Sequence, residues 1–446
     1  MKKILALLLA VAFLCSPLSL HKTKAVEPSH IRSRTAVLMD ADTGQVLYDK
    51  GMHRRVYPAS TTKILTALLA VENLNPDEVM TVSESALAGL PFYGAHIALV
   101  VGEELTVEDA IFAMMLPSAN DASNVLAEYV AGSLEAFAEM MTERAHQIGA
   151  VNTNFTNAHG LHCEDHFTTA YDMALITRHA MENEEFRRYF AVAHHLMPPT
   201  NKNVARDLHN FHYMLVPAIG YFDPTLTGGK VGFTQPARHT MSTTASRDGR
   251  NLVCVVMYST ARGDKFADTI ALLDFGFDEF TAITIPRERF SGTELPVMQD
   301  GRELGYAIFE ADSDFSALIH TLADPDELHI QTRRPDYYDY DNPSPYTVRF
   351  ELVSPLPFVP NFLGMTELSP TVKIRAAETY AALLLSEQRP TPFWPRALTI
   401  TGIALVGVVV LVVVLEARRK SQIKKRRIRR LEQLVRRQQA EQNFRF

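Results

Sequence analysis

The chain has few of the residues that several common kinds of protein site require. It contains three cysteines in 446 residues, Cys15, Cys163 and Cys254, and no Cys-x-x-Cys pair. So few cysteines build neither a disulfide framework nor a cysteine zinc site. Whether Cys163 and Cys254 form a disulfide or remain separate thiols stays open at this stage. The Gly-x-Ser-x-Gly elbow and the Gly-x4-Gly-Lys-Ser/Thr phosphate loop are also absent, which disfavours α/β-hydrolases and phosphate-loop enzymes.

Positive charge is scarce in the middle of the chain and concentrated at its ends. The net charge is −7, but residues 1–25 hold four lysines and no acidic residue. Residues 416–446 hold twelve basic residues against three acidic ones, which leaves 28 basic and 48 acidic residues in 26–415. We expect no nucleic-acid partner for this acidic body, because phosphate recognition requires positive charge.

The two ends of the chain predict export and membrane attachment. Residues 1–25 combine Lys2 and Lys3 with an apolar run and a polar stretch ending at Ala25, as a signal peptide does. Residues 397–415 are 19 residues without a charge, enough to cross a bilayer. The basic segment 416–446 follows directly, and positive residues stay cytoplasmic. This tail either only sets the topology or also contacts anionic lipid or a cytoplasmic partner.

Hydrophobic periodicity divides the exported body into strands and helices. The patterns at 35–40 and 45–49 predict a hairpin, and a mostly helical stretch follows from 61 to about 192. Because strands precede and follow the helices, we expect both ends of this region to meet in one antiparallel sheet. The later strands are expected at 226–233, 239–246 and 252–258, a helix at 264–275, and a β-rich segment beyond it that includes 346–352.

A serine and a lysine three residues apart form the first candidate catalytic motif. Ser60 and Lys63 would lie on one face of a helix that starts after Pro58 and continues to Val71. A serine hydroxyl needs a base to become a nucleophile, and a buried lysine with a lowered pKa can provide one. The spacing alone equally fits a serine at a helix start followed by a solvated lysine.

Two further motifs lie downstream. Ser118 and Asn120 stand two residues apart at a predicted helix start, where a helix cap is an alternative explanation. Lys230 lies on a predicted strand between Gly229 and Gly232. A glycine inside a strand marks the close approach of another backbone or of a ligand.

Together, the three motifs have the order and approximate spacing of the penicillin-recognising serine enzymes. The chain resembles the low-molecular-weight penicillin-binding proteins, the serine-type D-alanyl-D-alanine carboxypeptidases, over essentially its whole length. The stretches 157–161 and 168–174 support this resemblance. It implies an α+β fold of the β-lactamase/transpeptidase type. The domains would be a signal peptide at 1–25, a catalytic domain at 26–282, a small β-rich domain at 283–385, a transmembrane helix at 397–415 and a cytoplasmic tail at 416–446.

The resemblance also implies a role for each motif residue. Ser60 would be the nucleophile, Lys63 its base, and Ser118 a proton relay toward the leaving amine. The oxyanion would lie between the backbone N–H groups of Ser60 and Phe233. The substrate-binding residues would be Asn120, Lys230, Gly232, Phe233 and Thr234. The substrates would be peptidoglycan stem peptides ending in D-Ala-D-Ala, β-lactams would be covalent inhibitors, and neither a cofactor nor a metal is implied.

One position departs from the family's third motif, which is normally Lys-Thr-Gly. Val231 occupies the middle position and lacks the hydroxyl that would bind the substrate carboxylate. We expect slower or altered turnover, and Arg238 or Thr234 as a substitute contact. Arg238 itself stands where related sequences commonly have glycine.

Alternative functions follow from this departure and from neighbouring histidines. One alternative is a penicillin-binding scaffold that recognises cell-wall peptide without cleaving it. A β-lactamase is disfavoured because no Glu-x-x-Leu-Asn stretch occurs at the required place. The histidines between His159 and His166 belong to the family's structural pattern, and the His194–His195 pair is expected to be structural, so we expect no metal at either.

Overall fold

The computed structural model describes residues 28–374, apart from 29, 290, 312, 322, 324–329, 334–335, 342–345, 353–359 and 361. The predicted signal peptide, the predicted membrane helix at 397–415 and the basic tail all lie outside the described residues. Within the described part, no helix is both long and apolar enough to cross a bilayer.

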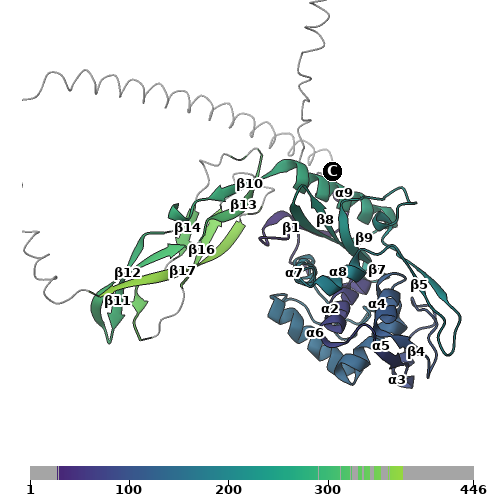
Figure 1. The fold of residues 1–446 in the computed structure, drawn as a ribbon. Coiled ribbons are helices and arrows are strands. Elements are labelled where there is room, and N and C mark those ends of the chain that lie inside the picture. The colour runs from purple at the N-terminus through teal and green to yellow at the C-terminus, as the bar shows by residue number, and fades with distance from the viewer. Residues whose placement is uncertain are drawn as a thin grey trace, which may run out of the picture. The chain divides into compact units, whose positions relative to one another are not determined.

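A five-stranded antiparallel sheet forms the centre of the α/β part of the chain. Its strand order is β2-β1-β9-β8-β7, so the first strands pair with the last ones, as predicted (Figure 1). Asp248 and Gly249, both with positive φ, form the two-residue turn between β8 and β9. The strands are β1 Thr35–Asp40, β2 Val46–Lys50, β7 Leu226–Thr234, β8 Arg238–Arg247 and β9 Arg250–Ser259.

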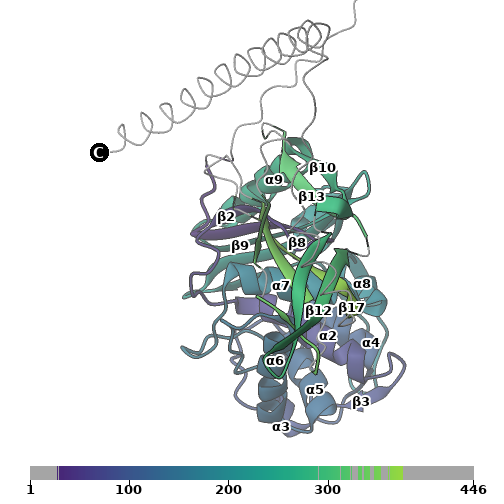
Figure 2. The ribbon, with the colours of Figure 1, turned by 90° about the vertical axis from the view of Figure 1, so that its left-hand side faces the viewer.

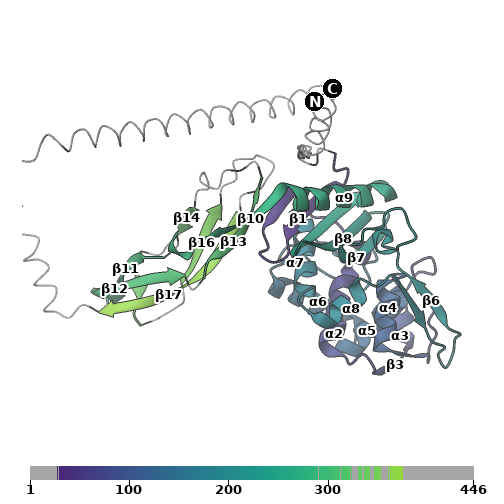
Figure 3. The ribbon, with the colours of Figure 1, turned by 45° about the horizontal axis from the view of Figure 1, so that its top comes forward.

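Helices cover both faces of this sheet. Helix α9 lies along one face, and α7 packs on the other with the remaining helices behind it (Figures 2 and 3). These helices are α2 Lys63–Asn73, α3 Glu84–Leu87, α4 Val107–Met115, α5 Asn120–Ala131, α6 Leu134–Ile148, α7 Ala170–Ala180, α8 Glu184–Phe190 and α9 Arg262–Glu279. The α+β class predicted from the sequence is confirmed.

Helix α2 runs through the middle of the helical cluster. Its residues from Lys63 to Ala70 are all buried, which explains why its sequence is apolar around the whole circumference. It packs against α4, α5, α6, α7 and α8. A helix enclosed on every side is held rigidly, and so are side chains at its N-terminal end.

Helix α9 is longer than the sequence predicts. The sequence predicts a helix over 264–275, but α9 spans Arg262–Glu279 and continues through Gly276. A Cβ atom on Gly276 would come within 2.7 Å of both Leu38 and Leu252. This glycine therefore permits close packing of the helix on the sheet rather than ending the helix.

The chain after α9 is rich in β-strands, as predicted. Strand β10 Phe280–Ile285 follows α9 directly and pairs with β13 Phe315–His320. A six-stranded sheet has the order β14-β16-β17-β12-β11-β15. Its strands are β11 Thr293–Gln299, β12 Arg302–Ala311, β14 Ile330–Arg333, β15 Tyr338–Asp339, β16 Tyr346–Leu352 and β17 Phe362–Ile374. The predicted boundary after residue 282 falls inside β10, and the division into domains stays a prediction.

Several short elements escaped the sequence analysis. They are helix α8, the two-stranded pair β3 Val79–Thr81 with β4 Glu104–Thr106, and the hairpin β5 His194–Met197 with β6 Arg206–His209. Each is three to seven residues long. Such short runs carry too few residues for a hydrophobic period to be recognised.

Cys163 and Cys254 do not form a disulfide. Cys254 is buried in the central sheet, while Cys163 is exposed, and both are free thiols. Burial raises the pKa of Cys254 to about 12, so this thiol is unreactive at neutral pH.

Candidate active site

The predicted nucleophile lies in a short 3-10 turn rather than in a regular α-helix. The turn spans Ala59–Thr62 and runs directly into α2 at Lys63. In a 3-10 turn, side chains three residues apart line up one above the other. The Nζ atom of Lys63 donates a hydrogen bond to Oγ of Ser60 at 3.2 Å. The two predicted catalytic residues are therefore in direct contact.

Lys63 is fully buried, and its Nζ lies within hydrogen-bond distance of three oxygen atoms. Besides Ser60, it donates to Oδ1 of Asn120 and to the backbone carbonyl of His159, both at 2.7 Å. Burial lowers the pKa of Lys63 well below its ordinary value, and the charge of Lys230 lowers it further, while Asp121 opposes the shift. A lysine in this environment gives up its proton much more readily than one in water.

The loop 157–161, noted in the sequence for its family resemblance, holds the side chain of Lys63. Its residue His159 provides the carbonyl that Lys63 binds, and the carbonyl of Ala158 accepts from Oγ1 of Thr66 at 2.7 Å. Gly160 has φ +87°, and a Cβ atom there would lie 1.8 Å from the carbonyl oxygen of Ala59. Only glycine allows this loop to pack against the turn that carries Ser60.

Ser118 does not cap the helix that follows it. Ala119 is the N-cap residue of α5, and Ser118 has a φ of 69°. Its Oγ atom is buried, lines the same pocket as Ser60, and has no hydrogen-bond partner within the described ranges. A buried hydroxyl without a partner is costly, which indicates a site prepared for a ligand or a water molecule.

Asn120 is held on both its backbone and its side chain. Its Oδ1 accepts from Lys63, and its backbone N–H donates to the carbonyl of Ala95 at 2.8 Å. The neighbouring Asp121 accepts backbone N–H groups of Ile97 and Leu99. The start of α5 thereby fixes the loop that contributes Ala95 to the pocket.

Strand β7 passes directly beside Ser60. A Cβ atom on Gly232 would lie 2.7 Å from the backbone nitrogen of Ser60 and 2.5 Å from Oγ1 of Thr240. The close approach predicted for the glycines of this strand is therefore present. Thr240 in turn donates to the carbonyl of Pro58 at 2.9 Å, which ties β8 to the same turn.

Lys230 is buried on β7 and its Nζ donates to the carbonyl of Val231 at 3.2 Å. Burial, together with the charge of Lys265, lowers the pKa of Lys230 to about 7. The structure thus brings Ser60, Lys63, Ser118, Asn120 and Lys230 into one region, although the motifs are up to 170 residues apart in the chain.

An open pocket of about 340 Å³ lies over Ser60 and Ser118. Val231 lines it with a methyl surface where the family motif would present a hydroxyl. Arg262 and Lys265, both from α9, also line it, and the sequence analysis missed them. No local motif marks these two cations. The other lining residues are Ala95, Phe211, Gly232, Phe233 and His239.

Lys265 is the more enclosed of the two cations. It is only 4% exposed, and its Nζ lies 5.0 Å from the centre of the Phe266 ring. Burial and the charge of Arg262 lower its pKa to about 8. Arg262 donates to the hydroxyl of Tyr213 at 2.5 Å. Together they make this side of the pocket positive, although the surrounding body is acidic.

Thr234 and Arg238, the substitutes expected for the missing hydroxyl, have other contacts. Thr234 Oγ1 accepts the backbone N–H of Ala237 at 3.2 Å, and Arg238 is exposed and donates to Gln235 at 3.4 Å. Arg238 has φ 56°, which explains why glycine suits this position. Neither residue lines the pocket described here.

The histidines between 159 and 166 have structural contacts. Nδ1 of His159 accepts the backbone N–H of Leu161 at 3.1 Å, and Nδ1 of His166 accepts that of Thr156 at 3.0 Å. The Nε2 of His166 bonds Oγ1 of Thr62 at 2.8 Å, and burial lowers the pKa of His166 to about 3. This histidine is neutral at neutral pH and anchors the turn that carries Ser60.

Comparison with known proteins agrees with this geometry. A carboxypeptidase DacF from Bacillus subtilis is 32% identical over 256 residues, which cover 56% of this chain and 63% of DacF. The aligned region thus spans just under two thirds of that relative. The Streptomyces K15 DD-transpeptidase structure matches with a TM-score of 0.51 and 26% identity, covering 56% of this chain and 98% of that one.

A third match extends further along the chain. The D-alanyl-D-alanine carboxypeptidase DacD structure from Francisella tularensis matches with a TM-score of 0.57 and covers 78% of this chain and 96% of that one. At 21% identity this similarity concerns the fold alone. The model of peptidase family S11, described as D-alanyl-D-alanine carboxypeptidase, matches residues 22–261, more than half of the chain. The chain therefore belongs to the D-alanyl-D-alanine carboxypeptidase family of peptidases.

Proposed function

We propose that this chain is a membrane-anchored serine D-alanyl-D-alanine carboxypeptidase that removes the terminal D-Ala of peptidoglycan stem peptides and is inhibited by penicillin. The observation that carries the proposal is the contact between Ser60 Oγ and the Nζ of a fully buried Lys63. A serine in contact with a lysine of lowered pKa can carry out acyl transfer without a histidine.

Acylation begins with transfer of the Ser60 proton to neutral Lys63 as Oγ attacks the carbonyl carbon between the two D-alanines. The resulting tetrahedral oxyanion is stabilised by backbone N–H groups, for which Ser60 and Phe233 are our candidates. The Gly232 backbone approaches the Ser60 nitrogen closely enough to support this arrangement. Each such donor contributes about 3 to 4 kcal/mol in a comparable enzyme.

Collapse of the tetrahedral intermediate releases D-alanine and requires a proton on the leaving amine. Ser118 is suited to relay to this amine the proton that Lys63 took from Ser60, which leaves Lys63 neutral again, because Ser118 Oγ is buried, unpartnered within the described ranges, and lines the same pocket as Ser60. The acyl group then rests on Ser60 until water attacks the ester. Neutral Lys63 accepts the proton of that water and returns it to Ser60 Oγ as the ester bond breaks.

The negatively charged end of the substrate needs a cationic partner. Val231 offers no hydroxyl, so we propose Lys265, with Arg262 beside it, as the contact for the terminal carboxylate. Both side chains line the pocket, whereas Arg238 and Thr234 do not. A charge-assisted bond of this kind contributes about 1.5 to 3 kcal/mol.

We also propose a location for the enzyme. The signal-like segment 1–25, the apolar run 397–415 and the basic tail favour a single-pass protein of the bacterial cell membrane. Its catalytic part would face the cell wall, and the tail would lie in the cytoplasm. Protease digestion of intact spheroplasts tests this topology: the body should be cleaved while an epitope placed after residue 446 is protected.

Release of D-alanine from a pentapeptide ending in D-Ala-D-Ala tests the activity. The wild-type chain should release D-alanine and form a covalent adduct with a fluorescent penicillin, and Ser60→Ala should do neither. Loss of both activities in Ser60→Ala with an unchanged circular dichroism spectrum would assign them to this serine. Release by Ser60→Ala at the wild-type rate would disprove the proposal.

A second candidate is a penicillin-binding scaffold that recognises cell-wall peptide without turning it over. The observation in its favour is Val231, which removes a polar contact from the pocket wall. Stable penicillin labelling without D-alanine release would support the scaffold. Rapid loss of the label would instead indicate a β-lactamase.

A further inference from the structure

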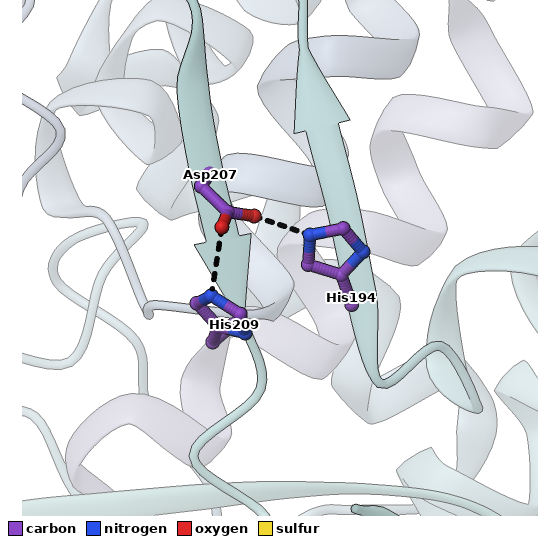
Figure 4. Close-up of side chains that lie close together, drawn as sticks. All are labelled: His194, Asp207 and His209. Atoms are coloured by element: carbon purple, nitrogen blue, oxygen red, sulfur yellow. Dashed lines mark hydrogen bonds and ion pairs between the residues drawn. The ribbon is translucent and has the colours of Figure 1, made fainter.

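A cluster of two histidines and one aspartate lies on the β5–β6 hairpin, outside the pocket over Ser60. The two strands are antiparallel, and His194 is paired directly with His209. Asp207 precedes His209 by two residues, so both side chains project from the same face of β6. Figure 4 shows the imidazoles of His194 and His209 on either side of the Asp207 carboxylate.

The three side chains already converge on one point. His194 Nε2 contacts one carboxylate oxygen of Asp207, and His209 Nε2 lies 3.1 Å from the other. One ligand atom from each of the three residues lies within 4.8 Å of the others. A tetrahedral ion with bonds of about 2.0 to 2.1 Å holds its ligand atoms about 3.3 Å apart. Small side-chain rotations would therefore suffice to place an ion between them.

We propose that His194, Asp207 and His209 bind one divalent transition-metal ion of the zinc type. Two imidazole nitrogens and one carboxylate oxygen match the preferences of Zn²⁺, whereas Mg²⁺ and Ca²⁺ prefer oxygen ligands throughout. The side chains are 51%, 58% and 65% exposed, so water can complete the coordination. The ion would replace the two contacts that the imidazoles now make with the carboxylate.

The backbone that carries this cluster is fixed by its neighbours. His195, the next residue on β5, bonds Asp109 at 2.8 Å and stacks on Phe112 with ring centres 4.1 Å apart. Arg206, the residue before Asp207, forms an ion pair with the buried Glu103 at 2.8 Å. His195 and Arg206 thus attach the hairpin to other segments of the chain. The backbone that carries the proposed metal ligands is therefore held in place before an ion binds.

The proposed metal site is also linked through β6 to the pocket over Ser60. Strand β6 ends at His209, and Phe211, two residues later, lines the pocket over Ser60. Between them, Asn210 donates its backbone N–H to Ala193 and its side chain to Val192. An ion on His209 would hold together the two strands from which this pocket wall extends.

Zinc binding to the purified full-length chain, measured by calorimetry after treatment with a chelator, tests the proposal. All variants should carry Cys163→Ser, because an exposed thiol is itself a zinc ligand. We expect one ion per chain, and an affinity at least tenfold lower in His194→Ala and in His209→Ala. Asp207→Asn, which keeps the shape of the side chain, should also weaken binding. Mg²⁺ should not compete at equal concentration.

The matched control is His53→Ala, since His53 is an exposed histidine outside the cluster. This control should bind zinc as the parent does. Zinc should also raise the melting temperature of the parent and of the control, but not that of His194→Ala, because only a bound ion stabilises the native state. Absence of zinc binding in the parent, or equal affinity in the parent and both histidine variants, would overturn the proposal. Equal weakening by His53→Ala would do so too.

Discussion

The Nζ of Lys63 donates a hydrogen bond of 2.7 Å to the backbone carbonyl of His159, a residue 96 positions away in the sequence. The carbonyl belongs to the loop that packs, through Gly160, on the turn that carries Ser60. The position of Lys63, the proposed base, therefore depends on a backbone carbonyl of this loop. This dependence gives the first of five predictions.

Gly160→Ala should slow the acylation of Ser60 by more than backbone strain at this position alone would cause. A Cβ atom at 1.8 Å from the Ala59 carbonyl must displace the loop or the turn that carries Ser60. Gly132→Ala is a matched control, because Gly132 has φ +80° but nothing within 4 Å of its Cβ position. In both variants, an alanine in the left-handed backbone conformation should lower the free energy of unfolding by about 1 to 2 kcal/mol. Only Gly160→Ala should also slow labelling by fluorescent penicillin, by roughly tenfold or more, as 1.4 kcal/mol of barrier corresponds to tenfold.

Val231→Thr should increase D-alanine release. The substitution is close in shape and adds the hydroxyl that the pocket wall lacks, so one further bond to the substrate carboxylate becomes available. A gain of roughly tenfold or more in kcat/KM is expected from one hydrogen bond. Val231→Ala, which adds no hydroxyl, serves as the comparison. An unchanged kcat/KM in Val231→Thr would mean that the carboxylate is already fully bound by other groups.

Lys265→Ala should raise KM for the pentapeptide by roughly ten- to a hundredfold, since it removes a charge-assisted bond to the terminal carboxylate. Arg238→Ala is the control, because Arg238 is also a cation near the end of β7 but its side chain bonds Gln235. The control should leave KM within about twofold of the wild type. A larger effect for Arg238→Ala than for Lys265→Ala would return the carboxylate contact to Arg238.

The pH profile of kcat/KM should have an acidic and an alkaline limb. Lys63 acts as a base only when neutral, so the rate rises with pH as this lysine loses its proton, and its lowered pKa brings that rise below the ordinary lysine range. Lys230 and Lys265, with pKa values of about 7 and about 8, lose positive charge as the pH rises through these values. Binding of an anionic substrate should then weaken.

Lys265→Arg separates the two limbs. A guanidinium stays charged throughout this range, so the alkaline limb should move to higher pH while the acidic limb stays in place. The measurement is kcat/KM between about pH 5 and pH 10, within which His and shifted Lys groups titrate. An alkaline limb that coincides in the wild type and in Lys265→Arg would exclude Lys265 as its cause.

The two cysteines of the described part should differ sharply in reactivity. In the native protein, Cys163 should react with a thiol reagent at once, because it is exposed, whereas Cys254 should react only after unfolding. Mass spectrometry of labelled peptides, before and after addition of guanidinium chloride, distinguishes the two. Labelling of neither thiol until a reductant is added would indicate a disulfide and contradict the structure.

Sequence reasoning reached much of this fold because local patterns are strong here. The predicted strands at 35–40 and 346–352 have the observed bounds, and the order of elements implied one sheet closed by its two ends. The motif spacings were also sufficient to select Ser60, Lys63, Ser118, Asn120 and Lys230 as candidates. These residues carry their chemistry in the side chain, so their types could be read directly.

Only the tertiary structure determined the contacts between segments that lie far apart in the chain. The carbonyl of His159 and the cations Arg262 and Lys265 carry no local signature, because any residue has a carbonyl and lysines are common on helices. The helix predicted at 264–275 continues through Gly276, because a glycine needed for close packing and one that ends a helix look alike in sequence. The amino-acid sequence alone determined which catalytic side chains are available. Folding determined which lysine is buried away from water, because burial depends on neighbouring segments that only the complete fold brings together.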